Sequence, residues 1–430
     1  MRETLSFMLQ VNVLRQRVEW AKERLAVKNF KEPELVDEII ALDDERKKLQ
    51  AEFDSLQSKI NASSKDIGKL MAAGNKEETD QLKASVAEWK KSLDPVKQQS
   101  DLAEKKLFEI LTLLPNLPAE SVPKGFGADD NETVKEGGNK PALPENALPH
   151  WELAKKYKLI DFELGTKITG SGFPVYTGKG AKLQRALIQC FLDYNTAAGY
   201  KEIVPPFVVN ESSAFATGQL PDKEGQMYFV NEDAFYLIPT SEVPVTNIYR
   251  DTIVKQEELP IRMTAYSPCF RREAGSYGKD VRGLNRLHQF EKVEIVQIVE
   301  AGKSYAALDE MVGHVEQLIQ SLNLPYRILR LCGGDMSFAS ALTYDFEVYS
   351  AAQKRWLEVS SVTNFETFQS NRLKCRYKDE SGKNQFVHTL NGSSLALPRI
   401  MACLLENNQT ESNIGLPQVL HKYFGESCLS

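Results

Sequence analysis

Two heptad-spaced runs of apolar residues near the N-terminus constrain the fold more than any other feature. The first run, Leu35 to Leu70, has eleven positions spaced alternately four and three apart, and nine of them are apolar. The second run, Leu82 to Leu114, follows the same spacing. Such spacing keeps one stripe of a helix against a partner helix. The segment MAAGNKEETD between the runs suits a tight reversal, so we predict an antiparallel coiled-coil hairpin over about residues 34–112.

One residue conflicts with this prediction. Pro95 falls inside the second helix, where it removes a backbone donor, and we expect it to kink or weaken that helix. A hairpin of this kind is also what a coiled-coil binding protein would use, so the pattern alone leaves the function open.

The character of the sequence changes after Pro115. Residues 115–150 are rich in proline, glycine and acidic residues and are predicted to form a linker. From residue 151 to 430, short alternating segments and separate amphipathic helices predict an α+β domain with a mostly antiparallel β-sheet flanked by helices. The expected strands include YRILRLCGGDM, YDFEVYSA, RWLEVSSVT and RLKCRY. Residues 1–114 would form a separate N-terminal domain.

Composition excludes several classes of protein. A chain of 430 residues suggests two or three domains. No apolar run approaches the roughly 18 residues of a membrane span, and no secretory signal is visible, so we expect no membrane association. The six cysteines are far apart and form no CxxC pair, which argues against structural zinc and against disulfides. A cytoplasmic protein with reduced thiols is the expectation.

Residues 270–295, FRREAGSYGKDVRGLNRLHQFEKVEI, concentrate arginines in a chain with a formal charge of −6. We predict two strands, 265–273 and 287–299, joined by a long loop at 274–286. Period-two geometry puts Arg271 and Glu273 on one face.

On the second strand, the same alternation puts Phe290, Lys292 and Glu294 on one face. A guanidinium suits phosphate, an aromatic plane suits a nucleobase, and a carboxylate suits an ammonium group. The combination indicates a nucleotide beside a small amine. A solvated charged hairpin with Phe290 in the core is the alternative.

Three further segments carry candidate polar groups. TSEVPVTN places Thr240 and Glu242 at a strand end, before a proline that suits the start of a helix. WLEVSSVTNFE contains Glu358 and Ser361, hard oxygen ligands that suit Mg²⁺ but lie three apart, so joint use requires a bulge or a strand end. HTLNGSSLALPR predicts strand, turn and helix, with Arg399 in the first helical turn as a polyphosphate ligand.

These segments together resemble the seryl-tRNA synthetases, a family of class II aminoacyl-tRNA synthetases. The resemblance rests on FRREAG, RGL and HQFEKVE combined with TSEVPVTN, EVSSVTNFE, the N-terminal arm and PNLP at 115–118. The first class II motif is similar to the helix around 180–199 followed by GYKEIVPPF, with Pro206 at the motif proline. The second motif is residues 270–295, and the third is LNGSSLALPR.

The resemblance implies a role for each matching residue. Arg271 and Arg399 would be the catalytic arginines, and Glu358 and Ser361 would hold Mg²⁺. The implied L-serine contacts are Thr240, Glu242, Arg271, Glu294 and Ser393. The implied ATP contacts are Arg271, Arg272, Glu273, Leu287, Phe290, Glu358, Val359, Ser360, Ser361 and Arg399. No zinc is expected.

The implied reaction is activation of L-serine with ATP to seryl-adenylate, then transfer to the 3′ end of tRNA(Ser), with tRNA(Sec) left open as a second acceptor. The arm and the loop of the second motif would contact tRNA, and the chain would be a homodimer. Lys279, Arg282 and Arg286 in that loop would face polyphosphate or the tRNA acceptor end. The rival is a non-charging synthetase-like paralogue or a coiled-coil binding protein.

Two short segments depart from the family pattern. The family commonly has Thr-Ala-Glu where this chain has Thr240-Ser241-Glu242. It also commonly has Gly-Ser-Gly and Gly-Arg where this chain has Gly392-Ser393-Ser394 and Pro398-Arg399. The ligand-bearing positions are retained in both.

Overall fold

The computed structural model describes residues 9–273 and 282–430. The chain divides into two compact units. The first contains the described residues up to Ala26 and those from Phe30 to Pro115, and the second contains Val27–Asn29 and Asn116–Ser430. In the described parts of the chain, no helix has the length and apolar character needed to cross a membrane.

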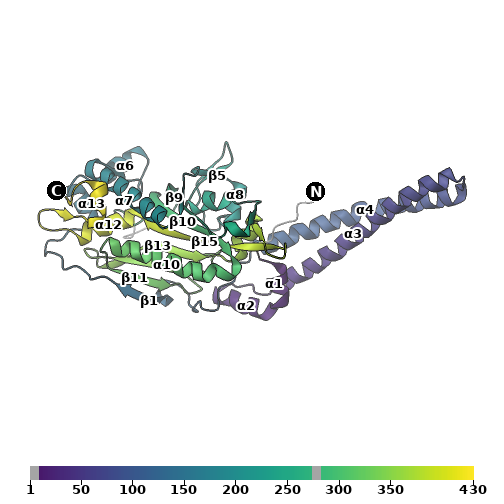
Figure 1. Ribbon diagram of the computed structural model, residues 1–430, viewed down its shortest axis with the longest axis horizontal. Helices are drawn as coiled ribbons and strands as arrows, with labels where there is room; N and C mark the ends of the chain where they lie inside the picture. The colour runs from purple at the N-terminus through teal and green to yellow at the C-terminus, as the bar shows by residue number, and fades with distance from the viewer. Residues whose placement is uncertain (1–8, 274–281) are drawn as a thin grey trace. The chain divides into compact units, whose positions relative to one another are not determined.

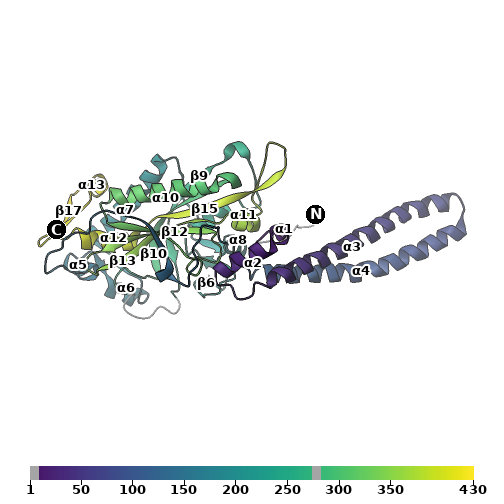
Figure 2. The same ribbon diagram turned by 90° about the horizontal axis from the view of Figure 1, so that it is seen from below.

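The first unit is helical and confirms the predicted hairpin. Its helices are α1 (Val11–Gln16), α2 (Val18–Val27), α3 (Leu35–Ala72) and α4 (Lys76–Leu111). Helices α3 and α4 run side by side in opposite directions (Figures 1 and 2). Every position of the two heptad seams is buried or half-buried, whereas most positions between them are exposed. The apolar stripes are therefore the surfaces by which the two helices pack.

Pro95 lies inside α4 without ending it, since the helix is continuous on both sides. Its expected kink stays a prediction.

A buried carboxylate fixes α1 to α3 within this unit. Asp43 accepts charge-assisted hydrogen bonds from Arg15 (3.0 Å) and Arg46 (2.8 Å), and its carboxylate lies 2.7 Å from the Lys47 ammonium. Burial alone would raise the pKa of Asp43, but the three cations outweigh it and lower that pKa. The first turns of the arm are thereby tied to a helix outside the hairpin.

The second unit confirms the predicted α+β class. Its main sheet has the strand order β1-β11-β12-β13-β15-β10-β9-β4, with β14 pairing β15 and β8 beside it. All neighbours along that order are antiparallel except β4 and β9, and β8 pairs β14 in parallel. Smaller sheets are β5-β7-β6, β2-β3 and β16-β17.

The strands of this unit are β1 (Glu132–Gly137), β2 (Ile160–Asp161), β3 (Val175–Tyr176), β4 (Lys201–Ile203), β5 (Val208–Asn210), β6 (Phe229–Val230), β7 (Phe235–Leu237), β8 (Ile253–Lys255), β9 (Ile261–Phe270), β10 (Gln289–Glu300), β11 (Tyr326–Arg330), β12 (Leu342–Ser350), β13 (Arg355–Asn364), β14 (Arg376–Lys378), β15 (Asn384–Ala396), β16 (Ile414–Gly415) and β17 (Cys428–Leu429). Strand β1 forms within the segment expected as a linker and pairs with β11.

The helices of this unit are α5 (His150–Lys156), α6 (Phe162–Ile168), α7 (Gly178–Ala197), α8 (Glu211–Ala216), α9 (Glu242–Asn247), α10 (Ser304–Ser321), α11 (Thr367–Leu373), α12 (Leu397–Asn407) and α13 (Gln418–Phe424). Among the described residues, short 3₁₀ turns include η1 (Ala128–Asp130), η2 (Gln256–Glu258) and η4 (Ala301–Lys303).

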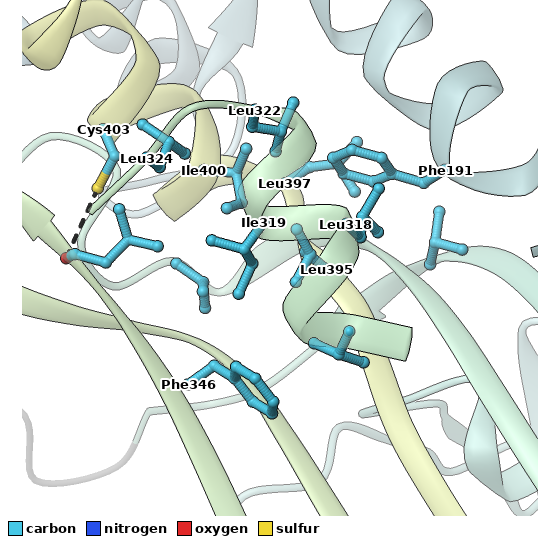
Figure 3. Close-up of a cluster of buried hydrophobic side chains, with 14 of the residues drawn as sticks. Phe191, Leu318, Ile319, Leu322, Leu324, Phe346, Leu395, Leu397, Ile400 and Cys403 are labelled. Atoms are coloured by element: carbon cyan, nitrogen blue, oxygen red, sulfur yellow. Dashed lines mark hydrogen bonds between the residues drawn. The ribbon is translucent and has the colours of Figure 1, made fainter. Parts of the chain in front are cut away.

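Helices α7, α10 and α12 pack on one face of the main sheet and form the core. Phe191 from α7, Leu318 from α10, Ile400 from α12 and Phe346 from β12 meet there, all fully buried (Figure 3). Strand β10 contributes Val293 and Ile295 to the same cluster. The core therefore anchors the strand whose even-numbered side chains carry the candidate site.

Two strand predictions are wrong in part. In YRILRLCGGDM, β11 ends at Arg330, and residues 331–336 lie outside any strand. RLKCRY was expected to be extended, but its first two residues, Arg372 and Leu373, end helix α11, and only Arg376 and Tyr377 belong to β14. The helical spacing places the Arg372 guanidinium 4.5 Å from the centre of the Phe368 ring, one turn earlier. Arg372 also donates to the carbonyl of Phe215 at 2.8 Å. The contact within the helix and the tertiary contact to Phe215 together outweigh the β propensity of the segment.

Candidate active site

A cavity of about 660 Å³ opens in the second unit. Its lining includes residues 217–224, 226–227 and 284–287, Arg271 just after β9, the start of β10, strands β13 and β15, and the starts of α9 and α12. Most of the predicted site residues line it. They are Thr240, Glu242, Arg271, Glu273, Leu287, Phe290, Glu358, Val359, Ser360, Ser361, Ser393 and Arg399. Two do not: Arg272 is exposed, and Glu294 is buried beneath the lining.

Arg271 and Glu273 line the cavity, but they do not do so from a strand as predicted. Strand β9 ends at Phe270, so neither residue belongs to the strand predicted over 265–273. The backbone leaves the extended conformation at Glu273, whose φ is 49°, and the period-two argument does not apply there. The Arg271 N–H donates to the carbonyl of His288 (2.9 Å), which keeps Arg271 beside the start of β10. Its guanidinium lies 5.2 Å from the centre of the Phe290 ring.

Strand β10 delivers the second set of predicted residues. Phe290 and Lys292 line the cavity, and Glu294 lies deeper on the same face, only 1% exposed. The Lys292 ammonium pairs with the Glu294 carboxylate and donates to Thr240 Oγ1 at 2.9 Å. One oxygen of Glu294, Oε1, is buried without a hydrogen-bond partner. Burial raises the pKa of Glu294, and the nearby Lys292 opposes that rise.

Glu242 is held from both sides by amide groups. Gln369 Nε2 donates to its Oε1 at 2.6 Å, and Asn391 Nδ2 donates to its Oε2 at 2.7 Å. Gln369 is itself fixed by Thr389, which donates to its Oε1 at 2.7 Å. Burial, and then the neighbouring charge of Glu294, raise the pKa of Glu242 to about 7. A buried carboxylate of this kind suits a cationic ligand.

A break in the ladder between β12 and β13 brings Glu358 and Ser361 to one cavity. Phe346 pairs with Ser360 and Glu347 pairs with Glu358, so Val359 has no partner of its own in the register. Both side chains thus line the cavity although they lie three residues apart. The predicted irregularity is confirmed.

The third segment contains no turn. Strand β15 continues to Ala396 and α12 begins at Leu397, so the expected order of strand, turn and helix is wrong at its middle step. The pairing of Ser393 with Glu294 on β10 keeps this stretch extended. Arg399 lies in the first turn of α12, as predicted, and donates to the carbonyls of Glu358 (2.8 Å) and Asn285 (3.1 Å).

The three cations predicted to face polyphosphate or tRNA, Lys279, Arg282 and Arg286, differ in what the structure shows of them. Lys279 lies outside the described residues. Arg282 is paired with Glu152 at 3.3 Å, and Arg286 is paired with Glu273 at 3.0 Å. Arg286 also lines the cavity.

Comparison with known proteins assigns the chain. Residues 8–118 match the seryl-tRNA synthetase N-terminal domain, and residues 228–408 match the class II tRNA synthetase core domain for G, H, P, S and T. The chain is similar to the serine–tRNA ligase of Salinibacter ruber, with 49% identity over 97% of this chain and 98% of the relative. The chain belongs to the seryl-tRNA synthetase family.

Solved structures of this family agree with the fold. The chain matches a seryl-tRNA synthetase from Pyrococcus horikoshii complexed with ATP, with a TM-score of 0.91, 30% identity and coverage of 98% of this chain and 99% of the other. It also matches a cytoplasmic serine–tRNA ligase from Naegleria fowleri in complex with AMP, with a TM-score of 0.87, 27% identity and 98% coverage of both chains. The protein is thus a class II aminoacyl-tRNA ligase of the serine–tRNA ligase type.

Several residues in or beside this cavity were given no role from the sequence. Lys292 was placed on the face with Phe290 and Glu294, but it was given no role in the site. Gln369 and Asn391 carried no local signal, since they meet Glu242 from separate elements. His288 was given no role, yet its Nδ1 lies 3.0 Å from the Arg271 carbonyl.

The raised pKa of Glu242 predicts a pH-dependent stability. Between about pH 4.5 and about pH 7, the folded protein retains a proton on Glu242 that the unfolded chain loses. The stability that this proton contributes is therefore complete below about pH 4.5 and disappears as the pH rises through about 7. We expect Glu242→Gln to gain stability relative to the wild type between pH 5 and pH 8, by an amount on the order of 3 kcal/mol. Thermal unfolding of both proteins without ligand measures the difference.

Glu411→Gln is the matched control, because Glu411 is an exposed carboxylate. The control should show no such gain. Parallel pH profiles for wild type and Glu242→Gln would contradict the assignment of a buried titrating carboxylate.

Proposed function

We propose that this enzyme activates L-serine with ATP and transfers the seryl group to tRNA(Ser). In the first step a serine carboxylate oxygen bonds to the α-phosphorus and pyrophosphate leaves. In the second step a hydroxyl of the terminal tRNA ribose attacks the acyl carbon, and AMP leaves. The observation that carries the proposal is the buried polar group of Thr240, Glu242, Lys292 and Glu294 beside Arg271.

This group supports recognition of a small hydroxylated amino acid. Two buried carboxylates, Glu242 and Glu294, can accept from an ammonium and a hydroxyl, and Glu294 Oε1 has an unused acceptor position. Thr240 adds a hydroxyl that donates to Glu294 at 3.3 Å, and Ser393 adds a second hydroxyl at the lining. Alanine would leave these buried acceptors unpaired, which is a large penalty.

The opposite end of the cavity supports a nucleotide. Phe290 offers a ring face for adenine, and Glu273 offers a carboxylate for its amino group. Arg271 would neutralise the α-phosphate and the serine carboxylate, and Arg399 would neutralise the γ-phosphate from the first turn of α12. The related enzymes complexed with ATP and with AMP support this use of the cavity.

Backbone groups complete the proposed nucleotide site. Leu287, Val359 and Ser360 line the cavity. Arg272 has its side chain exposed and its N–H bonded to the carbonyl of Gln226 at 2.8 Å, so any contact it makes with ATP depends on a change at this segment.

Residues around Glu358 fit a magnesium ion held against phosphates. Asp345, paired across the ladder with Ser361, has a buried Oδ1 without a hydrogen-bond partner. Burial and then the charge of Glu358 raise the pKa of Asp345. Glu358 and Ser361 would hold Mg²⁺, which when bound neutralises phosphate charge. No cluster of three or more His, Cys, Asp or Glu suited to a metal occurs among the described residues.

The first step needs orientation more than proton transfer. The serine carboxylate is already ionised at neutral pH, so it needs no general base. The chain's own contribution is to hold that carboxylate in line with the α-phosphorus and to offset the repulsion between the two anions with Arg271 and Arg399.

The rival proposal is a synthetase-like protein that does not charge tRNA. Such a paralogue is expected to lose some of the charged residues that activation needs. Arg271, Glu294, Glu358 and Arg399 are all retained here.

Serine-dependent exchange between ATP and pyrophosphate tests the proposed function. We expect exchange with L-serine, and a kcat/KM for L-alanine lower by about 10⁴-fold because the hydroxyl partner is missing. L-Threonine and glycine are also assayed. Threonine tests whether the cavity excludes a larger side chain, and glycine tests an amino acid that offers its ammonium group without a side chain. Exchange with a different amino acid would redirect the assignment, and absence of exchange with any amino acid would favour the rival.

We also propose that the α3–α4 arm and the loop after Arg271 contact the tRNA. Replacing residues 34–112 by a short Gly-Ser linker should preserve ATP–pyrophosphate exchange, because the cavity is built within the second unit. Charging of tRNA(Ser) should fall to background in the same variant, measured by acid-precipitable labelled serine. A tRNA(Sec) transcript is the second acceptor to assay. Normal charging without the arm would contradict this role.

We propose in addition that the enzyme is a cytoplasmic homodimer. Apolar side chains gather after β4, where Val204 is 83% exposed and Phe207 and Val208 are also exposed. An exposed cluster of this kind indicates an interface. Light scattering should give twice the 48.4 kDa of one chain, and Val204→Glu with Phe207→Glu should shift the mass toward the monomer. A wild-type monomer at micromolar concentration would contradict the dimer.

A further inference from the structure

His150 does not line the cavity and is fully buried at the start of α5. It contacts the turn that begins at Gly283 and Leu284. Its ring Nδ1 lies 2.7 Å from Glu406 Oε1 on α12. Its ring Nε2 accepts from the backbone N–H of Leu284 at 2.8 Å. One imidazole thus connects the helix that carries Arg399 with the chain segment that leads to Leu287.

These two contacts define which ring nitrogen donates and which accepts. A backbone N–H can only donate, so Nε2 must present a lone pair to Leu284. Nδ1 then carries the hydrogen and donates to Glu406. The carboxylate also accepts from the His150 backbone N–H at 2.9 Å and from Ser350. These bonds, led by His150, outweigh burial and lower the pKa of Glu406.

The network continues to the cavity wall. Gln353 Nε2 donates to Glu406 Oε1 at 3.0 Å, and Asn285 Nδ2 donates to Gln353 Oε1 at 2.9 Å. The carbonyl of Asn285 accepts from Arg399 Nε at 3.1 Å. Leu284 and Asn285 line the cavity themselves.

Close packing makes this arrangement specific. Gly283, just before the bonded N–H, has φ of +69°, and a Cβ there would lie 2.2 Å from His150 Nε2. The backbone therefore approaches the imidazole edge more closely than any residue with a side chain would allow. The absence of a side chain at Gly283 therefore allows this turn to contact the ring.

We propose that His150 is a positioning residue for the ATP half of the reaction. Its Nε2 fixes the turn at residues 283–287. The position of this turn determines where the Asn285 carbonyl, which orients Arg399, and the Leu287 backbone lie. His150 does not touch substrate. The inference rests on the proposed use of the cavity for ATP and L-serine.

Two substitutions separate the contacts of the ring. His150→Gln can place an amide oxygen where Nε2 lies, which keeps the acceptor for Leu284 and loses the Nδ1 donor. His150→Asn can place an amide nitrogen where Nδ1 lies, which keeps the donor to Glu406 and loses the acceptor. Both remove the imidazole packing, so each is the matched control of the other.

The experiment is steady-state ATP–pyrophosphate exchange with the full-length chain, varying ATP at saturating serine and serine at saturating ATP. We expect His150→Asn to raise the KM for ATP about 10-fold. His150→Gln should stay within about 3-fold of wild type, and the KM for serine should change less than that for ATP in both. Melting temperatures are measured alongside.

Equal KM values for ATP in the two variants, or changes that follow melting temperature alone, would overturn the positioning role. If neither variant folds, Gln353→Leu at a half-buried position breaks the Asn285 side of the network and should also raise the KM for ATP. An unchanged KM there would overturn the proposal too. Wild-type enzyme inactive with every amino acid would instead refute the proposed function.

Discussion

Strand β10 separates two environments, and the rest of the catalytic unit depends on that separation. Val293 and Ile295 are buried in the core under α7, α10 and α12, whereas Lys292 and Glu294 carry opposite charges on the other face. Because successive side chains alternate, the packing of the apolar residues also determines where the charges lie. Removing one partner of such a buried pair costs about 3 to 5 kcal/mol.

The neighbouring strands add functional groups to the charged face of β10. Ser393 comes from β15, paired opposite Glu294, and Arg271 follows the end of β9 on the other side. The break in register at Val359 then turns Glu358 and Ser361 to the same cavity. Positive charge from two arginines therefore meets negative charge from buried carboxylates within one concave site, which suits a polyanionic nucleotide beside a zwitterionic amino acid.

Regular patterns in the sequence predicted the fold well. The heptad seams predicted α3 and α4, and every seam position is buried or half-buried. The three-residue spacing of Glu358 and Ser361 required a bulge, which is present. Errors arose where the backbone leaves a regular period: Glu273 has a left-handed φ, and RLKCRY begins in a helix stabilised by Arg372 and Phe368.

Contacts between distant segments could not be predicted from one sequence. Gln369, Asn391 and Glu242 meet through tertiary packing, as do His150 and Glu406, which are 256 positions apart. Their residue types are ordinary and follow no spacing rule. Most residues whose roles came from family resemblance line the cavity, but Arg272 and Glu294 do not, and the chemistry of all of them stays a prediction.

A crystal structure with a non-hydrolysable seryl-adenylate analogue tests the central claim most directly. The account predicts adenine on the Phe290 ring, the phosphate mimic within hydrogen-bond distance of Arg271, and the seryl ammonium and hydroxyl on Glu242 and Glu294. Binding of the analogue in another cavity, or in this cavity with its seryl group away from both carboxylates, would contradict it.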